Sequence, residues 1–205
     1  MNRLYKNEQS GRSMVEMLGV LAIIGVLSIG GISGYSKAMA KYRVNKTLDQ
    51  ISMLVMNIRS LYSSSINYKG LNAQVAIQMG IIPRDMLPSG KTESDADAII
   101  NAYQGGVFLG SLHTGGSDRS FFVQYTGLTR EACVAIASAD WGSQAGSGLV
   151  KISVGPGATD QTASVTSFTN GGEYTMDSLP VTLAQAAGDC SNTGVIGNAV
   201  QWEYY

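Results

Sequence analysis

One uninterrupted apolar stretch near the N-terminus limits how this chain can fold. Residues 17–36 (MLGVLAIIGVLSIGGISGYS) contain no charged side chain, and about 20 such residues in a helix cross a hydrocarbon core of ~30 Å. A lone carboxylate, Glu16, stands just before this run, in an apolar segment that begins at Met14. An ionisable side chain is costly in lipid, so Glu16 is a candidate functional residue whose partner has to be found.

A short polar leader, residues 1–11 (MNRLYKNEQSG), precedes the apolar stretch and ends at Gly11. Its Arg3 and Lys6 resemble the basic start of a secretory signal. Ordinary signal cleavage is disfavoured, because the small residues at 36–40 include Lys37 and the apolar run continues directly into an amphipathic helical pattern. We therefore expect the apolar segment to remain in the mature protein.

The pattern predicts one helix over residues 14–63, apolar all round in its first half and one-sided in its second. We divide the chain into the leader (1–11), an apolar transmembrane or filament-core helix (12–36), the amphipathic half of that helix (37–65) and a head domain (66–205). Glycines in the first half either permit close helix packing or reflect the usual composition of membrane helices. The predicted inner stripe is Leu48, Ile51, Leu54, Val55, Ile58, Leu61 and Tyr62, and the predicted outer residues are Asp49, Gln50, Ser52, Asn57 and Arg59.

The rest of the chain predicts a glycine-rich α+β domain: the second half of the long helix packs against an antiparallel β-sheet. We expect Asn72 and Thr129 to cap short helices, with Gly80 ending the first of them. Val200, Trp202 and Tyr204 should share one face of a final strand. The expected strands are 105–113, 119–125, 149–154 and 199–205, with a hairpin loop at 114–118, a third short helix at 182–187, a turn-rich surface segment at 81–90 and an exposed loop at 155–178.

Charge and cysteine content narrow the possible functions. The net charge of −1 argues against nucleic-acid binding. Cys133 and Cys190 are the two cysteines, and both follow the apolar segment. An even count in an exported region predicts one disulfide, with two unrelated buried thiols as the alternative.

No pattern for catalysis or cofactor binding emerges from the sequence. His113, the single histidine, could pair with Cys133, but no third group is in sight to orient it. Asp95 and Asp97 resemble part of a calcium loop that lacks its glycine and its distal glutamate. We therefore predict that the chain is not an enzyme and has no catalytic residue, cofactor or metal site.

These residues together resemble the type IV prepilins. That family combines a basic leader ending in glycine, an apolar helix, and a glutamate five residues after the glycine, as Gly11 and Glu16 do here. The segments NAYQGGV (101–107) and FFVQYTGLTREAC (121–133), the late Cys190 and the aromatic C-terminal strand resemble the type IVb branch. The resemblance covers essentially the whole chain and implies the type IV pilin fold.

The resemblance implies a structural subunit that polymerises through its N-terminal helix. A prepilin peptidase would cut between Gly11 and Arg12, and Glu16 would then accept the new terminal amine of a neighbouring copy. The implied partners are further copies in a helical homopolymer, the peptidase and the inner-membrane assembly machinery. The precursor would lie in the inner membrane and the product in an extracellular filament. Arg12 departs from the usual apolar first residue, and a cation there opposes the helix dipole by ~0.3–1 kcal/mol.

Two related functions remain as alternatives. A minor pilin or tip adhesin would use the same anchor. A type II secretion pseudopilin is less favoured, since that group often lacks the cysteine pair. The sequence does not distinguish adhesion, conjugation and aggregation as roles of the filament.

The leader predicts where the mature chain begins. We expect mass spectrometry to find cleavage between Gly11 and Arg12, slow processing of Gly11→Ala, and accumulation of uncut Gly11→Val. A mature chain that starts at Lys37 or later would show that the leader is an ordinary signal peptide.

Overall fold

The computed structural model describes residues 14–87, 99–114, 117–142, 147–157, 171–194 and 197–205. It divides into two compact units, Met1–Lys41 and Tyr42–Tyr205. Helix α1 (Met14–Tyr62) contributes residues to both units and follows the predicted helix closely.

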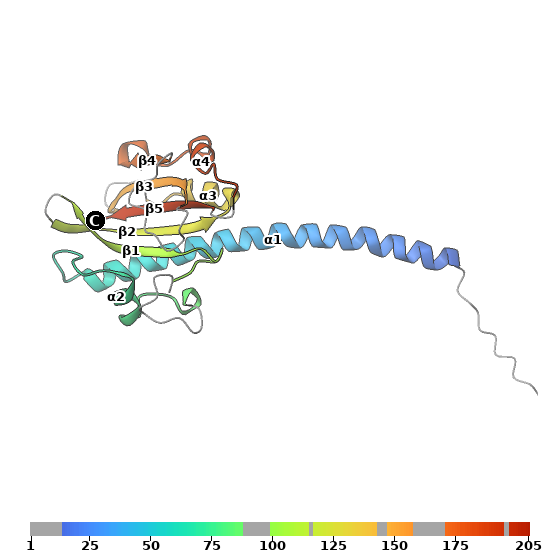
Figure 1. The fold of residues 1–205 in the computed structure, drawn as a ribbon, viewed down its shortest axis with the longest axis horizontal. Helices are drawn as coiled ribbons and strands as arrows, with labels where there is room; N and C mark the ends of the chain where they lie inside the picture. The colour runs from blue at the N-terminus through green and yellow to red at the C-terminus, as the bar shows by residue number, and fades with distance from the viewer. Residues whose placement is uncertain (1–13, 88–98, 115–116, 143–146, 158–170, 195–196) are drawn as a thin grey trace, which may run out of the picture. The chain divides into compact units, whose positions relative to one another are not determined.

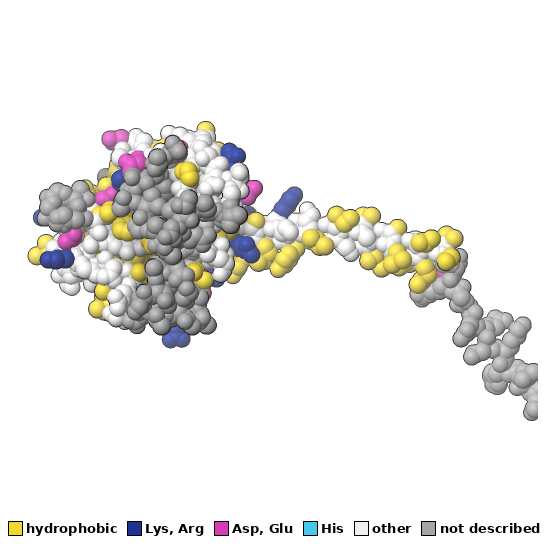
Figure 2. All heavy atoms as spheres, in the orientation of Figure 1, with side chains coloured by type: hydrophobic (Ala, Val, Ile, Leu, Met, Phe, Trp, Pro, Cys, Tyr) yellow, Lys and Arg dark blue, Asp and Glu magenta, His cyan; other side chains and the backbone are white. Residues whose placement is uncertain are grey.

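The described part of the first unit is a helical segment with exposed side chains. Between Met14 and Ile32 all of the large hydrophobic side chains are exposed, and Figure 2 shows hydrophobic side chains along this part of α1. Among the described residues, α1 is the one helix whose length and apolar composition would suffice to span a membrane. The helix continues through five glycines without interruption, and a Cβ at any of them would meet nothing within 4 Å: Gly19, Gly25, Gly30, Gly31 and Gly34.

The second unit is built on a five-stranded antiparallel sheet with the strand order β1-β2-β5-β3-β4 (Figure 1). The C-terminal strand therefore lies at the centre, between two strands that come before it in the sequence. This order explains why β5 is buried along its whole length. The bounds are β1 (Val107–Thr114), β2 (Ser117–Leu128), β3 (Leu149–Pro156), β4 (Gly172–Thr175) and β5 (Asn198–Tyr204).

The second half of α1 supplies one wall of the core. Ile51, Leu54 and Ile58 are fully buried in the cluster that contains Trp202, and the Arg59 guanidinium lies 4.8 Å from the centre of the Tyr204 ring. The predicted stripe is therefore correct at its centre, whereas Leu61 is exposed. Our prediction for Gln50 was wrong, because its side chain is buried rather than directed outward.

Local capping signals place the short helices as predicted. In α2 (Ala73–Gln78), the Val75 amide donates to Asn72 Oδ1 at 2.9 Å. In α3 (Arg130–Ala137), the Ala132 amide donates to Thr129 Oγ1 at 3.3 Å. A capping box formed by Thr182 and Gln185 begins α4 (Leu183–Asp189). Each cap satisfies helix N–H groups that otherwise lack a partner.

Three segments that we predicted to be surface turns or loops are partly buried or contain regular secondary structure. Ile81, Ile82 and Met86 are buried under α1 instead of lying in a surface turn, and residues 84–86 form the short 3₁₀ helix η1 (Arg84–Met86). The expected loop at 155–178 contains the end of β3, strand β4 and the 3₁₀ helix η2 (Met176–Ser178), while residues 158–170 are outside the described residues. The strands of the hairpin reach further into the predicted loop 114–118 than expected. Strand β1 includes Thr114, and strand β2 includes residues 117–118.

The alternation along β5 predicted that Val200, Trp202 and Tyr204 share one face of the strand. Val200, Trp202 and Tyr204 do face the core with α1, but Gln201 and Glu203 on the opposite face are also nearly inaccessible. Glu203 accepts a hydrogen bond from Ser120 at 3.0 Å. The periodicity therefore predicted the side to which each residue points, and on the opposite face Ser120 of β2 and Lys151 of β3 both contact Glu203.

A close crossing of two chain segments fixes the start of β1 against the end of β2. The Asn101 side chain donates to the Thr126 carbonyl at 2.8 Å and accepts from the Gly105 amide at 3.1 Å. A Cβ on Gly105 would overlap the Thr126 carbonyl oxygen, and Gly127 adopts a positive φ of 68° beside Gly105. Both glycines are therefore required by the backbone geometry.

We expect Gly105→Ala to destabilise the protein by about 1–3 kcal/mol, since the added methyl overlaps a packed backbone. Gly188→Ala is the matched control, because it lies in α4 with open space around it and should be neutral or stabilising by up to ~1 kcal/mol. Urea unfolding of the full-length protein in detergent, followed by tryptophan fluorescence, measures both. Equal stability of the two variants would contradict the crossing.

Candidate functional site: the assembly helix and the disulfide-bonded region

Glu16 lies in the first turn of α1 and is exposed. A carboxylate at a helix N-terminus is favoured by the helix dipole. Met14, Val15 and Leu18 around it are exposed apolar side chains, so the carboxylate is surrounded by a surface that water solvates poorly. Gly11 and Arg12 lie outside the described residues, and so does the predicted processing site.

The apolar side chains on the exposed helix of the first unit can be buried by contact with another molecule. Monomeric soluble proteins rarely expose apolar patches of more than a few hundred Å². A continuous apolar helix without a cover of its own is suited to lipid or to other apolar helices. Its exposed large side chains are Met14, Val15, Met17, Leu18, Val20, Leu21, Ile23, Ile24, Val26, Leu27, Ile29 and Ile32.

The disulfide joins α3 to the residue that ends α4. Cys133 and Cys190 are both fully buried, their sulfurs are 2.02 Å apart, and they are separated by 57 positions in the sequence. Cys133 lies on the inward face of α3 with Ala132, Ile136 and Ala137, as predicted. The bond removes the thiol needed for a pair with His113, whose side chain is not among those described.

A second contact ties the edge strand β4 to α4 beside the disulfide. The Tyr174 hydroxyl donates a hydrogen bond to Asp189, the last residue of α4. Burial raises the pKa of Tyr174, and the hydrogen bond to Asp189 raises it further. Gly172 leaves room for this contact, since a Cβ there would overlap the Asp189 carboxylate. The sequence offered no local signal for the pair, because Tyr174 falls in the glycine-rich segment expected to be a loop.

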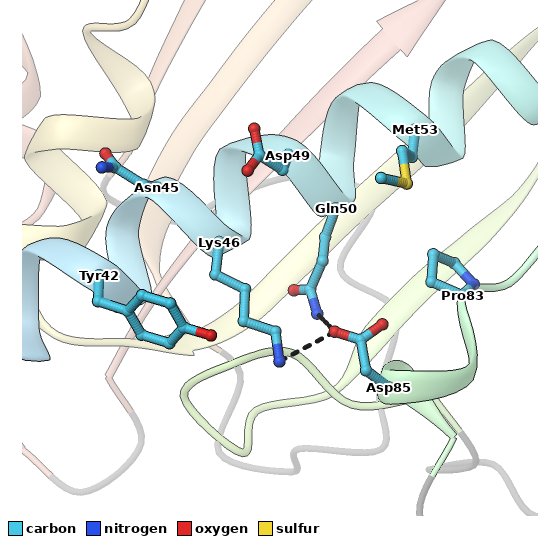
Figure 3. A pocket seen from close by; sticks show the side chains of 8 residues that line it. All are labelled: Tyr42, Asn45, Lys46, Asp49, Gln50, Met53, Pro83 and Asp85. Atoms are coloured by element: carbon cyan, nitrogen blue, oxygen red, sulfur yellow. Dashed lines mark hydrogen bonds and ion pairs between the residues drawn. The ribbon is translucent and has the colours of Figure 1, made fainter.

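A cleft of about 550 Å³ lies where α1 faces the segment around η1. In Figure 3 the side chains of Lys46 and Gln50 point from α1 toward Asp85. Lys46 Nζ lies 2.9 Å from Asp85 Oδ2, and Gln50 Nε2 donates to the same oxygen at 3.0 Å. Partial burial by itself would raise the pKa of Asp85, but the hydrogen bonds from Lys46 and Gln50 outweigh it and the pKa is lowered. Sequence reasoning missed this cluster, because Asp85 lies 35 or more positions away from Gln50 and Lys46 in the sequence.

No group of three or more potential metal ligands occurs among the described residues. Asp95 and Asp97 lie outside them. The described residues have features suited to association with other molecules. These are an exposed apolar helix, a carboxylate at its start, and a second unit that contains a disulfide.

Comparison with known proteins identifies the family to which this chain belongs. A family model described as "PilS N terminal" matches residues 41–202. The major structural subunits of the bundle-forming pilus from Escherichia coli O111:H- and Escherichia coli O127:H6 are 24% and 25% identical over 193 residues. In each case the match covers 94% of this chain and 92% of the relative.

Solved structures share the fold at lower sequence identity. The type IVb pilin from Salmonella typhi has a TM-score of 0.55 and 19% identity, with 78% of this chain and 98% of that chain covered. TcpA, a type IV pilin from Vibrio cholerae El Tor biotype, has a TM-score of 0.52 and 18% identity, with 80% and 99% covered. The fold is thus that of the type IV pilins. The chain belongs to the PilS family of type IVb pilins.

The disulfide should contribute strongly to the stability of the second unit. Its loop corresponds to ~4 kcal/mol in the chain-entropy model. We expect the double substitution of Cys133→Ala and Cys190→Ala to lower the free energy of unfolding by about 2–5 kcal/mol. Cys133→Ala alone should lose about as much, because it also lacks the bond and the remaining Cys190 thiol packs as a small apolar side chain. A double variant as stable as the parent would show that the bond is dispensable.

Proposed function

We propose that this chain is the repeating structural subunit of a type IVb-like pilus. The single observation that carries the proposal is the exposed apolar helix at residues 14–36, in a chain whose second unit has a complete core of its own. The two bundle-forming pilus relatives are both named as major structural subunits, which favours a repeating subunit over a rare tip protein.

The apolar helix can serve in two environments in turn. In lipid it would anchor the precursor, with the leader on the cytoplasmic side and the second unit exported. In the filament the same side chains would pack against the helices of neighbouring copies. The transfer costs little in hydrophobic free energy, because one apolar environment replaces another.

Glu16 gives this packing a register. Cleavage between Gly11 and Arg12 would create an α-amine, and both that ammonium and the Glu16 carboxylate are poorly solvated among apolar side chains. Pairing the amine of an incoming copy with Glu16 of an assembled copy removes two unfavourable charges together. An offset of the helices along the filament axis would leave both charges unpaired, so the pair selects one axial position.

Processing and export follow from the same proposal. A prepilin peptidase would act on the precursor in the inner membrane, and the inner-membrane assembly machinery would extract the mature chain into a filament outside the cell. The disulfide suits that destination, since such bonds persist in oxidising compartments.

The test separates processing from assembly. Glu16→Ala and the isosteric Glu16→Gln should be cleaved and membrane-inserted normally, because processing depends on the leader. Both should form few or no filaments by electron microscopy, since an unpaired buried charge costs about 3–5 kcal/mol. Glu16→Asp should be intermediate, being shorter but still anionic.

Glu173→Ala is the control, because it removes an exposed carboxylate of the second unit and should assemble normally. Normal filament yield from Glu16→Gln would show that this carboxylate is not the assembly contact.

A further inference from the structure

The cleft beside η1 contains an acidic side chain that forms no ion pair or hydrogen bond with the described residues. Lys46 and Gln50 both bind Asp85 Oδ2, which neutralises that carboxylate. Asp49 also lines the cleft and is exposed, and it has neither an ion pair nor a hydrogen bond among the described residues. In Figure 3 its carboxylate points away from the Lys46–Asp85 pair. The cleft therefore carries one uncompensated negative charge.

The other walls of the cleft are suited to the apolar part of a long cationic side chain. Tyr42, Met53 and Pro83 line it, and the first two are more than half exposed. The face of an aromatic ring and a carboxylate each attract an ammonium or guanidinium group. Gln50 adds a buried amide oxygen that has no hydrogen-bond partner among the described residues. The charged side chains of the cleft are Lys46, Asp49 and Asp85, so one negative charge is left over after Lys46 pairs with Asp85.

We propose that this cleft receives a lysine or arginine side chain from the second unit of another copy of this chain, as a head-to-head contact within the filament. The inference rests on the proposed function, since it requires copies to be packed side by side. Two observations favour another copy as the occupant. The cleft begins at Tyr42, which directly follows the segment proposed to pack between copies. The described residues of the second unit also include exposed cations that could bind there: Arg43, Lys69, Arg84, Arg119 and Arg130.

Charge reversal tests the contact. Asp49→Lys should be processed, disulfide-bonded and membrane-inserted, yet its yield of sheared filaments should fall at least about tenfold, because like charges across an interface are strongly unfavourable. Asp177→Lys is the matched control: it reverses another exposed aspartate that has no partner among the described residues, and its yield should change less than about twofold. Asp49→Asn should lie between these two.

Rescue then identifies the partner. Asp49→Lys is combined in turn with Arg43→Glu, Lys69→Glu, Arg84→Glu, Arg119→Glu and Arg130→Glu. One combination should restore filaments, because it recreates an opposite pair across the interface. Equal yields from Asp49→Lys and Asp177→Lys, or failure of all five combinations, would overturn the proposal.

Photo-crosslinking separates this inference from the proposed function. A benzophenone amino acid replaces Met53 in the cleft or, in a second variant, Leu27 in the apolar segment. Both should give crosslinked dimers in filaments, with the Met53 product joined to the second unit of another copy. Dimers from Leu27 but not from Met53 would overturn the cleft contact alone, whereas no dimers from either would overturn the proposed function as well.

Discussion

The exposed apolar surface of residues 14–36 is the constraint on which the rest of the molecule depends. Water solvates such a surface poorly, so this segment has to be covered by lipid or by other chains throughout its life. A chain with this property needs a second unit that folds without using those side chains. The division at Lys41 and Tyr42 meets that need, because the core residues of α1 begin only after it.

The second unit is stabilised by contacts between segments far apart in the sequence. The C-terminal strand lies at the centre of the sheet, so the sheet is complete only when the last residues are in place. The disulfide and the Tyr174–Asp189 hydrogen bond then fix α3, α4 and β4 to one another. A unit closed in this way can be attached to an exposed apolar helix without that helix contributing to its core.

Sequence reasoning succeeded where the signal is local. The long helix, the caps at Asn72 and Thr129 and the inward face of α3 follow from periodicity and from hydrogen bonding over three or four residues. It failed where burial is decided at long range. Gln50 is polar and was placed outside, yet Asp85 meets it from 35 positions away. The Tyr174–Asp189 contact and strand β4 had no periodic pattern to reveal them. Glu16, the proposed assembly residue, stood out because a carboxylate is unusual in an apolar segment, whereas the cleft depends entirely on tertiary structure.

The account claims that copies associate through the apolar helix, with Glu16 setting the axial position. Cryo-electron microscopy of native filaments is the most direct test. The account predicts that residues 14–36 are buried along the filament axis and that the Glu16 carboxylate lies within hydrogen-bonding distance of the N-terminal amine of another copy. A filament whose copies touch only through their second units, with these helices exposed or Glu16 remote from every amine, would contradict it.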